Sequence, residues 1–264
     1  MTQREKAERF AALHESGTFV MPNPWDAGSA KVMAALGFQA LATTSSGFAF
    51  TLGRLDGGAT LDEVVDHTAA LDAATPLPVS VDLENGYGPD PADAAAAIVR
   101  VAGAGAVGGS IEDFSPDEGV YGIDRAVERV AAAVEAARAL TFPFALTARA
   151  ENHIRGNPDL VDTIARLQAY EAVGADVLYA PGLRTGEEIR AVCEALSKPV
   201  NVLARPDLAL AEIAAVGARR ISVGGALTWV AVGAMAGAAT KIGDGDLAAL
   251  RSNVPIEEWL TPPG

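Results

Sequence analysis

The chain has 264 residues, half of them hydrophobic, and a formal net charge of −14. This acidity argues against nucleic acids and anionic membranes as partners, because both bind basic surfaces. No apolar run approaches the roughly 18 residues that span a membrane, and the chain opens with an amphipathic helix pattern rather than a signal peptide, so a cytoplasmic location is expected. A lone cysteine, Cys193, supports neither a disulfide nor a cysteine metal cluster.

Short apolar segments alternate along the chain with Ala-rich stretches of helical periodicity. Strict alternation predicts parallel strands joined by right-handed crossovers, and eight such units favour a closed (β/α)8 barrel over an open doubly wound sheet. Strands are predicted at Phe19–Met21, Ala40–Thr43, Val79–Asp82, Gly109–Glu112, Phe144–Arg149, Val177–Tyr179, Val200–Leu203 and Arg220–Val223. Helices are predicted between them, for example at Pro91–Ala104, Arg125–Leu140, Asp159–Val173 and Glu187–Leu196.

One domain is expected over residues 1–264, with a helix before the first strand and a further segment after the last. That last segment, Leu227–Thr240, is apolar and rich in Gly and Ala, which is more than a solvent-facing helix requires. We therefore expect it to form a contact between subunits of a homo-oligomer.

Acidic residues close two neighbouring strands, at the barrel end where active sites of such folds lie. Asp82 and Glu84 are two positions apart and face the same way if the strand continues, and Glu112 joins them from the next strand. Clustered carboxylates raise one another's pKa unless a cation neutralises them, and oxygen ligands without His or Cys favour Mg²⁺ or Mn²⁺. The alternative is that each acid caps a helix or lies in a solvated loop.

An arginine closes the fifth predicted strand, in the apolar run FPFALTAR. The guanidinium of Arg149 suits a carboxylate or phosphonate held by two hydrogen bonds, and the alternative is a structural salt bridge to one of the acids. Other strand ends carry polar or aromatic residues that suit substrate binding: Trp25, Asn201 and the turn formed by Thr44, Ser45, Ser46 and Gly47. Such Ser/Thr/Gly clusters are also ordinary loop chemistry.

Four segments taken together resemble the isocitrate lyase/phosphoenolpyruvate mutase superfamily over roughly residues 20–225. They are NPWDAGSAKVMAALGFQALATTSSG, VDLENGYG, GGSIED and LTARAE. The resemblance implies a (β/α)8 barrel, tetramers in which the last helix swaps between neighbouring subunits, and Mg²⁺ bound with a small 2-oxo acid. It also implies that a C–C or P–C bond is made or broken through an enolate-like intermediate, whose charge the cation stabilises.

Position by position, the resemblance assigns the metal shell to Asp82, Glu84 and Glu112, some directly and some through water. An acid in the loop after the second strand, Asp56 in LGRLDG, completes that shell. The carboxylate-binding turn falls on Thr44, Ser45, Ser46 and Gly47, and the clamp on the substrate's carboxylate or phosphonate falls on Arg149.

The chain departs from the superfamily after the fourth strand. Lyases of the superfamily carry a Lys-Lys/Arg-Cys-Gly-His gating segment there, whereas this chain reads DFSPDEGVYGIDRAVERV, without Cys, Lys or His. The Lys and Asn of the phosphonomutases are missing from this loop too, and Cys193 lies on a helix as a packing residue. The loop therefore supports neither isocitrate or methylisocitrate cleavage nor phosphonate rearrangement.

Another group must then move the proton. The candidates are His153, which follows the fifth strand, Tyr87 beside the acidic pair, and Tyr121 within the altered loop; for His153 the alternative is a surface histidine. His14 and His67 lie in helical stretches away from strand ends and are expected to be structural or solvated.

The leading interpretation is a Mg²⁺-dependent lyase or decarboxylase that acts on a small 2-oxo dicarboxylate, since loss of CO₂ needs little acid–base machinery. The alternatives are a phosphonomutase, a non-catalytic protein that binds a 2-oxo acid such as 2-oxoglutarate, and an unrelated barrel that holds phosphate at Gly224 and Gly225. The acids around Asp82 argue against the phosphate barrel, because they would repel the phosphate unless a cation lay between them.

Overall fold

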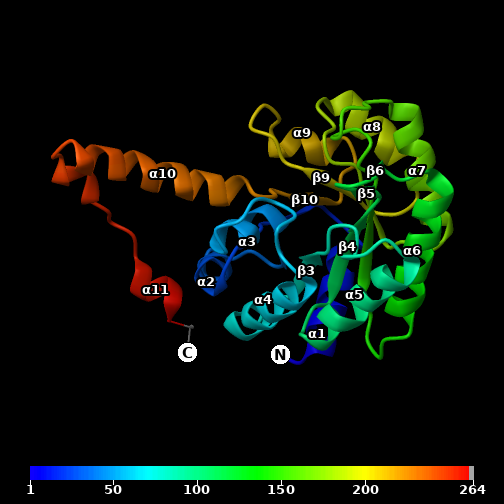
Figure 1. Ribbon diagram of the computed structural model, residues 1–264, viewed down its shortest axis with the longest axis horizontal. Coiled ribbons are helices and arrows are strands. Elements are labelled where there is room, and N and C mark those ends of the chain that lie inside the picture. Colours follow the sequence, from blue (N-terminus) through cyan, green and yellow to red (C-terminus); the bar gives the residue numbers. More distant parts are fainter. Residues whose placement is uncertain (262–264) are drawn as a thin grey trace.

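The computed structural model describes residues 1–261, and residues 262–264 lie outside the described part. Eight parallel strands form one sheet in the order β1-β10-β9-β8-β7-β4-β3-β2, with helices packed around its outside (Figure 1). The two outermost strands of that order meet where the Ala42 nitrogen donates to the Pro22 oxygen at 3.1 Å. The sheet is therefore a nearly closed (β/α)8 barrel, which confirms the predicted fold class.

The predicted strands agree with the observed ones to within one residue at each end, and the four predicted helices agree to within two. The barrel strands are β1 Phe19–Met21, β2 Leu41–Ala42, β3 Val79–Asp82, β4 Gly108–Glu112, β7 Ala145–Arg149, β8 Val177–Tyr179, β9 Val200–Leu203 and β10 Arg220–Ser222. The helices are α1 Gln3–Leu13, α2 Ala27–Ala35, α3 Ser45–Thr51, α4 Leu61–Ala74, α5 Pro91–Gly103, α6 Ile123–Arg138, α7 Leu160–Ala172, α8 Gly186–Glu194, α9 Leu210–Ala215, α10 Ala226–Gly243 and α11 Ile256–Leu260, with a 3-10 turn at Leu247–Leu250.

The Ala-rich composition of the helices reflects close packing against the barrel. On α5 the residues Ala94, Ala97, Ile98 and Val101 are fully buried, and their spacing places them on one face of the helix. Small side chains let the helix axis approach the sheet, while the branched ones fill the space between strands. A separate apolar cluster, which includes Phe10 of α1, packs against the first residues of several strands and closes the opposite end of the barrel from the site.

Two parts of the fold differ from the expectation. A short antiparallel hairpin, β5 Phe114–Ser115 and β6 Gly119–Val120, occupies the start of the segment that departs from the superfamily's gating sequence. The stretch Thr44–Gly47 is also not a free turn, because Thr44 is the N-cap of α3 and its hydroxyl accepts from the Gly47 amide at 3.4 Å.

The C-terminal part leaves the barrel. In Figure 1, α10 (orange) runs away from the other elements, and the chain then returns so that α11 (red) packs against α2. Only Thr228 of α10 is buried. Within residues 1–261, α10 is the one helix long and apolar enough to cross a membrane by length and composition, so the expectation that no such run exists is wrong. A single helix of this kind is weak evidence for a membrane, and its position after the last barrel strand is where the subunit contact was expected.

His67 is a buried structural histidine on α4. Its ring stacks on Phe48 with a centroid distance of 4.0 Å, and its Nε2 lies 3.1 Å from the Trp25 oxygen. Burial lowers the pKa of His67 from 6.5 to about 4. The folded protein therefore keeps this imidazole neutral at pH values at which the unfolded chain binds a proton.

We predict that this histidine makes stability fall with acidification. Its contribution is complete above pH 6.5 and is lost as pH falls towards 4, by about 3 kcal/mol for the full shift. Urea unfolding at pH 7.0 and pH 4.5 should show a smaller loss in His67→Gln than in the wild type. An equal loss in both proteins would mean that His67 does not contribute.

Candidate active site

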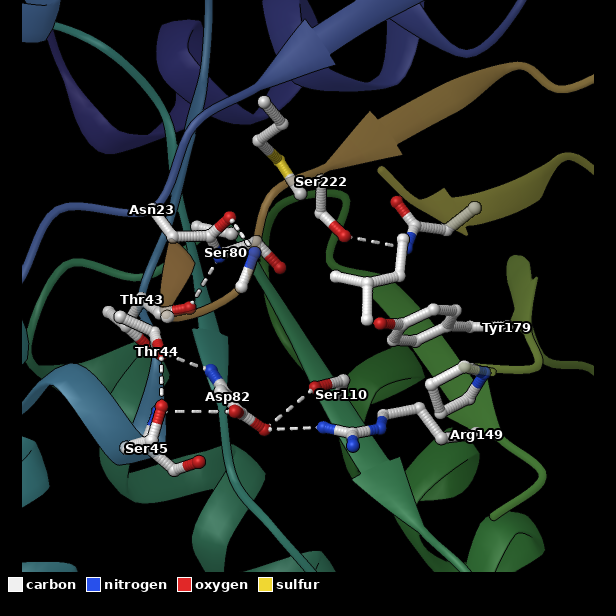
Figure 2. A pocket seen from close by; sticks show the side chains of 18 of the residues that line it. Asn23, Thr43, Thr44, Ser45, Ser80, Asp82, Ser110, Arg149, Tyr179 and Ser222 are labelled. Carbon is white, nitrogen blue, oxygen red and sulfur yellow. Dashed lines mark hydrogen bonds and ion pairs between the residues drawn. The ribbon is translucent and has the colours of Figure 1, made fainter. Parts of the chain in front are cut away.

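A cavity of about 220 Å³ opens at the C-terminal ends of the barrel strands (Figure 2). This is the end at which barrels of this kind place their active sites. Polar and apolar side chains share its wall, and the apolar ones come from β1, β2, β3, β9 and the loops after β7 and β8. Its lining includes Asn23, Thr43, Thr44, Ser45, Ser46, Asp56, Ser80, Asp82, Ser110, Arg149, Ile154, Tyr179, Pro181, Asn201, Leu203, Arg220 and Ser222.

Asp82 is the last residue of β3 and connects three sides of this cavity. Its Oδ1 accepts from Arg149 Nη1 at 2.9 Å and from the Ser110 hydroxyl at 3.4 Å, while its Oδ2 accepts from the Ser45 amide at 3.2 Å. Its own amide donates to the Thr43 hydroxyl at 2.8 Å. Figure 2 shows Asp82 between the loop after β2 and the strands β4 and β7. Asp82 thus links β3 to β4, to β7 and to the segment after β2.

Arg149 ends β7 and is bound by three acids. Its Nη1 lies 2.9 Å from Asp82 Oδ1, and its Nη2 lies 2.9 Å from Glu112 Oε2 and 2.8 Å from Glu151 Oε1. Burial opposes the charge, but Glu151, Glu112 and Asp82 outweigh it and hold the pKa of Arg149 well above its usual value. The structural salt bridge that was the alternative for this residue is therefore present. It does not remove Arg149 from the cavity wall, where a substrate anion can compete for it.

Two of the predicted metal ligands are buried acids with raised pKa values. Burial, followed by the charges of Asp82 and Asp56, raises the pKa of Glu84 to about 7. Burial also raises the pKa of Glu112 well above its usual value. A bound divalent cation would favour the ionised form of both carboxylates, and oxygen ligands alone suit Mg²⁺.

The structure nevertheless does not gather the four acids into one set of ligands. Within residues 1–261 no group of three or more His, Cys, Asp or Glu side chains is arranged to hold a metal ion. Asp56 and Asp82 line the cavity, whereas Arg149 links Asp82 to Glu112, and Glu84 Oε1 accepts from the Tyr87 hydroxyl at 3.3 Å. Arg149 and Ser110 bind Asp82 through Oδ1, and its Oδ2 accepts from the Ser45 amide.

The predicted substrate-binding residues divide into two groups. Thr44, Ser45, Ser46 and Asn201 lie on the cavity wall, together with Arg149. Gly47 and Trp25 lie behind that wall: a Cβ added to Gly47 would be 2.6 Å from the Thr228 hydroxyl and 3.4 Å from Trp25 Cβ. The missing side chain of Gly47 thus lets α3 approach the start of α10 closely, and Trp25 packs beside Gly47.

None of the predicted proton donors points into the cavity in the described residues. His153 is buried rather than on the surface, its Nε2 lies 4.0 Å from Glu188 Oε1, and its Nδ1 has no partner among residues 1–261. Tyr87 donates to Glu84, and burial raises the pKa of its phenol. Tyr121 is buried and accepts from Asn85 Nδ2 at 3.1 Å.

Sequence reasoning assigned no role to Tyr179, although it closes a strand like the other candidates. Tyr179 lines the cavity, and the Arg149 guanidinium carbon lies 5.3 Å from the centre of its ring. Burial raises the pKa of Tyr179 to about 12, so it keeps its proton at neutral pH. The position of Tyr179 at the end of β8 is a signal from which its place at the site could have been predicted.

Glu151 and Asp113 also follow strand ends, but the sequence suggested no role for them; they support the site from behind. Asp113 Oδ1 accepts from the Glu151 amide at 2.7 Å, and its Oδ2 accepts from Arg166 Nη1 at 2.9 Å and from the Tyr170 hydroxyl. Glu151 in turn binds Arg149. These contacts lie between elements far apart in sequence, so no local pattern revealed them.

Comparison with known proteins identifies the family. The sequence model of the phosphoenolpyruvate phosphomutase family matches residues 10–243, nearly the whole barrel. The chain belongs to this family, and so to the isocitrate lyase/phosphoenolpyruvate mutase superfamily, which confirms the resemblance seen in the sequence. A solved structure from Burkholderia cenocepacia J2315, provisionally assigned as a lyase/mutase, is 52% identical, covers 99% of this chain and 97% of its own, and has a TM-score of 0.95.

Relatives with named reactions are more distant. A structure of oxaloacetate acetylhydrolase with its product oxalate is 26% identical, covers 96% of this chain and 92% of its own, and has a TM-score of 0.87. A 2-methylisocitrate lyase of Halalkalibacterium halodurans is 29% identical over 75% of this chain and 67% of its own length. An oxaloacetate decarboxylase of Rhodopseudomonas palustris is 26% identical over 62% of this chain and 57% of its own length. The superfamily is thus one of lyases and mutases that act on small acids.

We predict that Arg149 is essential to the stability of the site. In Arg149→Met the buried carboxylates of Glu112 and Glu151 lose their main counter-charge, which should lower the free energy of unfolding by about 3–5 kcal/mol at pH 7. The control is Arg155→Met, because Arg155 binds the same acids with a side chain 39% exposed, and its loss should cost about 1 kcal/mol or less. Equal losses in urea unfolding would contradict this account.

Proposed function

We propose that the protein is a Mg²⁺-dependent lyase that breaks a C–C bond of a small 2-oxo dicarboxylate, with decarboxylation of an oxaloacetate-like compound as the favoured reaction. The observation that carries the proposal is the pair formed by Asp82 and Arg149 on the cavity wall, one residue suited to a hard cation and the other to a carboxylate. Two of the named relatives act on oxaloacetate, as their names state. The cavity is of a size for such a compact acid.

The chain's own residues would divide the work as follows. Asp82 would hold the cation directly, and Asp56, Glu84 and Glu112 would hold its water ligands. When bound, the cation would stabilise the negative charge that develops on the 2-oxo oxygen as the C–C bond breaks. Mn²⁺ could take the same place, because it accepts the same oxygen ligands.

Arg149 would bind the substrate carboxylate with the donors that now bind Asp82. The hydroxyls of Ser45 and Ser46 and the amide of Asn201 line the same cavity and would orient the remaining oxygens. Tyr179 is the protonated phenol on that wall and is the residue of the described site best placed to return a proton to carbon. The earlier candidates His153 and Tyr87 lie behind the wall and would act only after a rearrangement.

The altered loop favours decarboxylation over aldol-type cleavage. Loss of CO₂ leaves the bonding electrons on the carbon next to the oxo group, and a single proton from solvent or Tyr179 completes the product. The hairpin β5–β6 takes up the start of the segment without any Cys, Lys or His. A phosphonomutase stays the second candidate, because the matching family model bears that name and Arg149 also suits a phosphonate.

We predict that Asp82→Asn lowers the rate of Mg²⁺-dependent oxaloacetate turnover by about 100-fold or more. The amide side chain keeps the shape of the carboxylate but not its charge. Oxaloacetate loss and pyruvate formation are measured with and without Mg²⁺, against the protein-free rate. Asp62→Asn, whose carboxylate is 81% exposed, is the control and should match the wild type. Unchanged Mg²⁺ dependence in Asp82→Asn would reject the metal site.

The same assay separates the alternatives. Turnover of phosphonopyruvate in place of oxaloacetate would favour the phosphonomutase. Tight binding of 2-oxoglutarate without turnover of any substrate in the panel would favour a non-catalytic binding protein.

We further propose that α10 joins copies of this chain into a dimer or tetramer in the cytoplasm. The helix exposes Trp229, Val230 and Met235 by 48%, 69% and 61%, on different sides of its axis, and a protein surface rarely leaves so much apolar area uncovered.

We predict that the double variant Val230→Glu/Met235→Glu is smaller in solution than the wild type, because buried charges would oppose the contact. Light scattering after size-exclusion chromatography measures the mass. Val161→Glu, at an apolar residue of α7 that is 79% exposed, is the control and should leave the mass unchanged. A monomeric wild type, or an unchanged mass in the double variant, would contradict the proposal.

A further inference from the structure

The loop that carries Glu84 has an unusual backbone. Glu84 and Tyr87 have φ values of 48° and 64°, and they are the two non-glycine residues of positive φ within residues 1–261. Side chains rarely adopt this region, and such conformations persist at functional sites only when surrounding structure imposes them. Between the two, Gly86 lies so close to α5 that an added Cβ would be 2.7 Å from Ala94 Cα. Something must hold this loop in place.

Arg129 of α6 binds the backbone of that loop. Its side chain is enclosed, with the residue 1% exposed, and its guanidinium donates to the carbonyl oxygens of Asn85, Gly88 and Pro89, with 2.8 Å from Nη2 to the Gly88 oxygen. One of these carbonyls, that of Asn85, lies between the two non-glycine residues of positive φ, and the other two follow Tyr87. A planar guanidinium is suited to this task, because its fixed fork of donors matches a fixed set of acceptors.

Tyr121 also contacts Arg129. The guanidinium carbons of Arg125 and Arg129 lie over its ring, 4.6 Å and 5.2 Å from the ring centre. Its hydroxyl accepts from Asn85 Nδ2, and Asn85 Oδ1 accepts from the Tyr87 amide at 3.1 Å. The chain of contacts therefore runs from α6 through the loop to Tyr87, whose hydroxyl binds Glu84.

We propose that Arg129 is a positioning residue for the Mg²⁺ site. It holds the loop of residues 84–89 in the conformation that keeps the Glu84 carboxylate beside Asp82 and Asp56. The Glu84 backbone is tied to the site as well, because its oxygen accepts from the Glu112 amide at 2.8 Å. The inference rests on the proposed function in that it takes Glu84 to be part of the metal shell.

Magnesium affinity of the full chain, measured by calorimetric titration, tests the proposal. Arg129→Gln should weaken Mg²⁺ binding by about 10-fold, which is the order of effect seen when a group outside the direct ligands of a metal loses its support. Arg129→Lys should lose less, because it keeps the charge and some donors. Arg138→Gln is the control: it lies on the same helix, binds Asp176 and the Gly174 oxygen at the other end, and should leave the affinity unchanged.

A double-mutant cycle with Glu84→Gln shows whether Arg129 acts through this carboxylate. Arg129→Gln should have little further effect on Mg²⁺ affinity once Glu84 is neutral. Amide hydrogen exchange at Gly86 and Tyr87 should be faster in Arg129→Gln and unchanged in Arg138→Gln. Equal Mg²⁺ affinity in the wild type and in Arg129→Gln, or an effect of equal size in the Glu84→Gln background, would overturn the inference.

Two further outcomes are decisive. If Arg129→Gln does not fold, Tyr121→Phe serves in its place, since it keeps the ring and removes only the hydroxyl that binds Asn85. A measurable loss of Mg²⁺ affinity in that variant supports the loop's role, and wild-type affinity opposes it. A wild type that binds no Mg²⁺ at all rejects the proposed function and this inference together.

Discussion

The arrangement of the site depends on one guanidinium among several acids. Arg149 stands at the end of β7 and binds Asp82, Glu112 and Glu151, which come from β3, β4 and the loop after β7. Buried carboxylates so close together repel one another, and the arginine is the cation that makes their burial tolerable. Any ligand of the cavity therefore changes a balance of charge that already exists. A divalent cation on Asp82 and an anionic substrate on Arg149 would replace one ion pair with two.

The balance of charge between Arg149 and its acids depends on residues that hold the site in place without touching the cavity. Asp113 fixes the Glu151 backbone from one side, and Arg129 fixes the loop of Glu84 from the other. Both belong to hydrogen-bond networks that link the barrel to α6 and α7. The altered segment after β4 contributes Tyr121 to one of these networks. Where the superfamily's lyases have a gating sequence, this chain has part of a fixed scaffold.

The fold could be predicted from the sequence because each unit carried a local signal. The strand Val79–Asp82 shows a period-two pattern in the sequence, and α5 shows a helical one, in the spacing of Ala94, Ala97, Ile98 and Val101. No contact with a distant part of the chain overrides these local patterns. The cavity residues Asp82, Arg149 and Asn201 could be predicted for the same reason, since each ends a strand and the barrel brings those ends together. The apolar character of α10 was also visible, although its full length was underestimated.

Side-chain direction and pairing could not be predicted. His153 follows β7 like a candidate acid or base, yet its ring is buried towards Glu188, because the loop turns it away from the cavity. Glu84 and Tyr87 adopt left-handed backbone conformations that depend on Arg129, some 40 residues further along the chain. The pairing of Arg149 with the acids was an open alternative, since only the packed barrel decides which of two partners a buried arginine takes.

The exchange of partners at Arg149 is the central claim, and a crystal structure with Mg²⁺ and oxalate tests it most directly. The account predicts an ion coordinated by Asp82 and the oxalate, with Arg149 turned from Asp82 to the ligand and still paired with Glu112. An ion pair between Arg149 and Asp82 that stays intact at saturating concentrations, with the cavity either filled or empty, would contradict it.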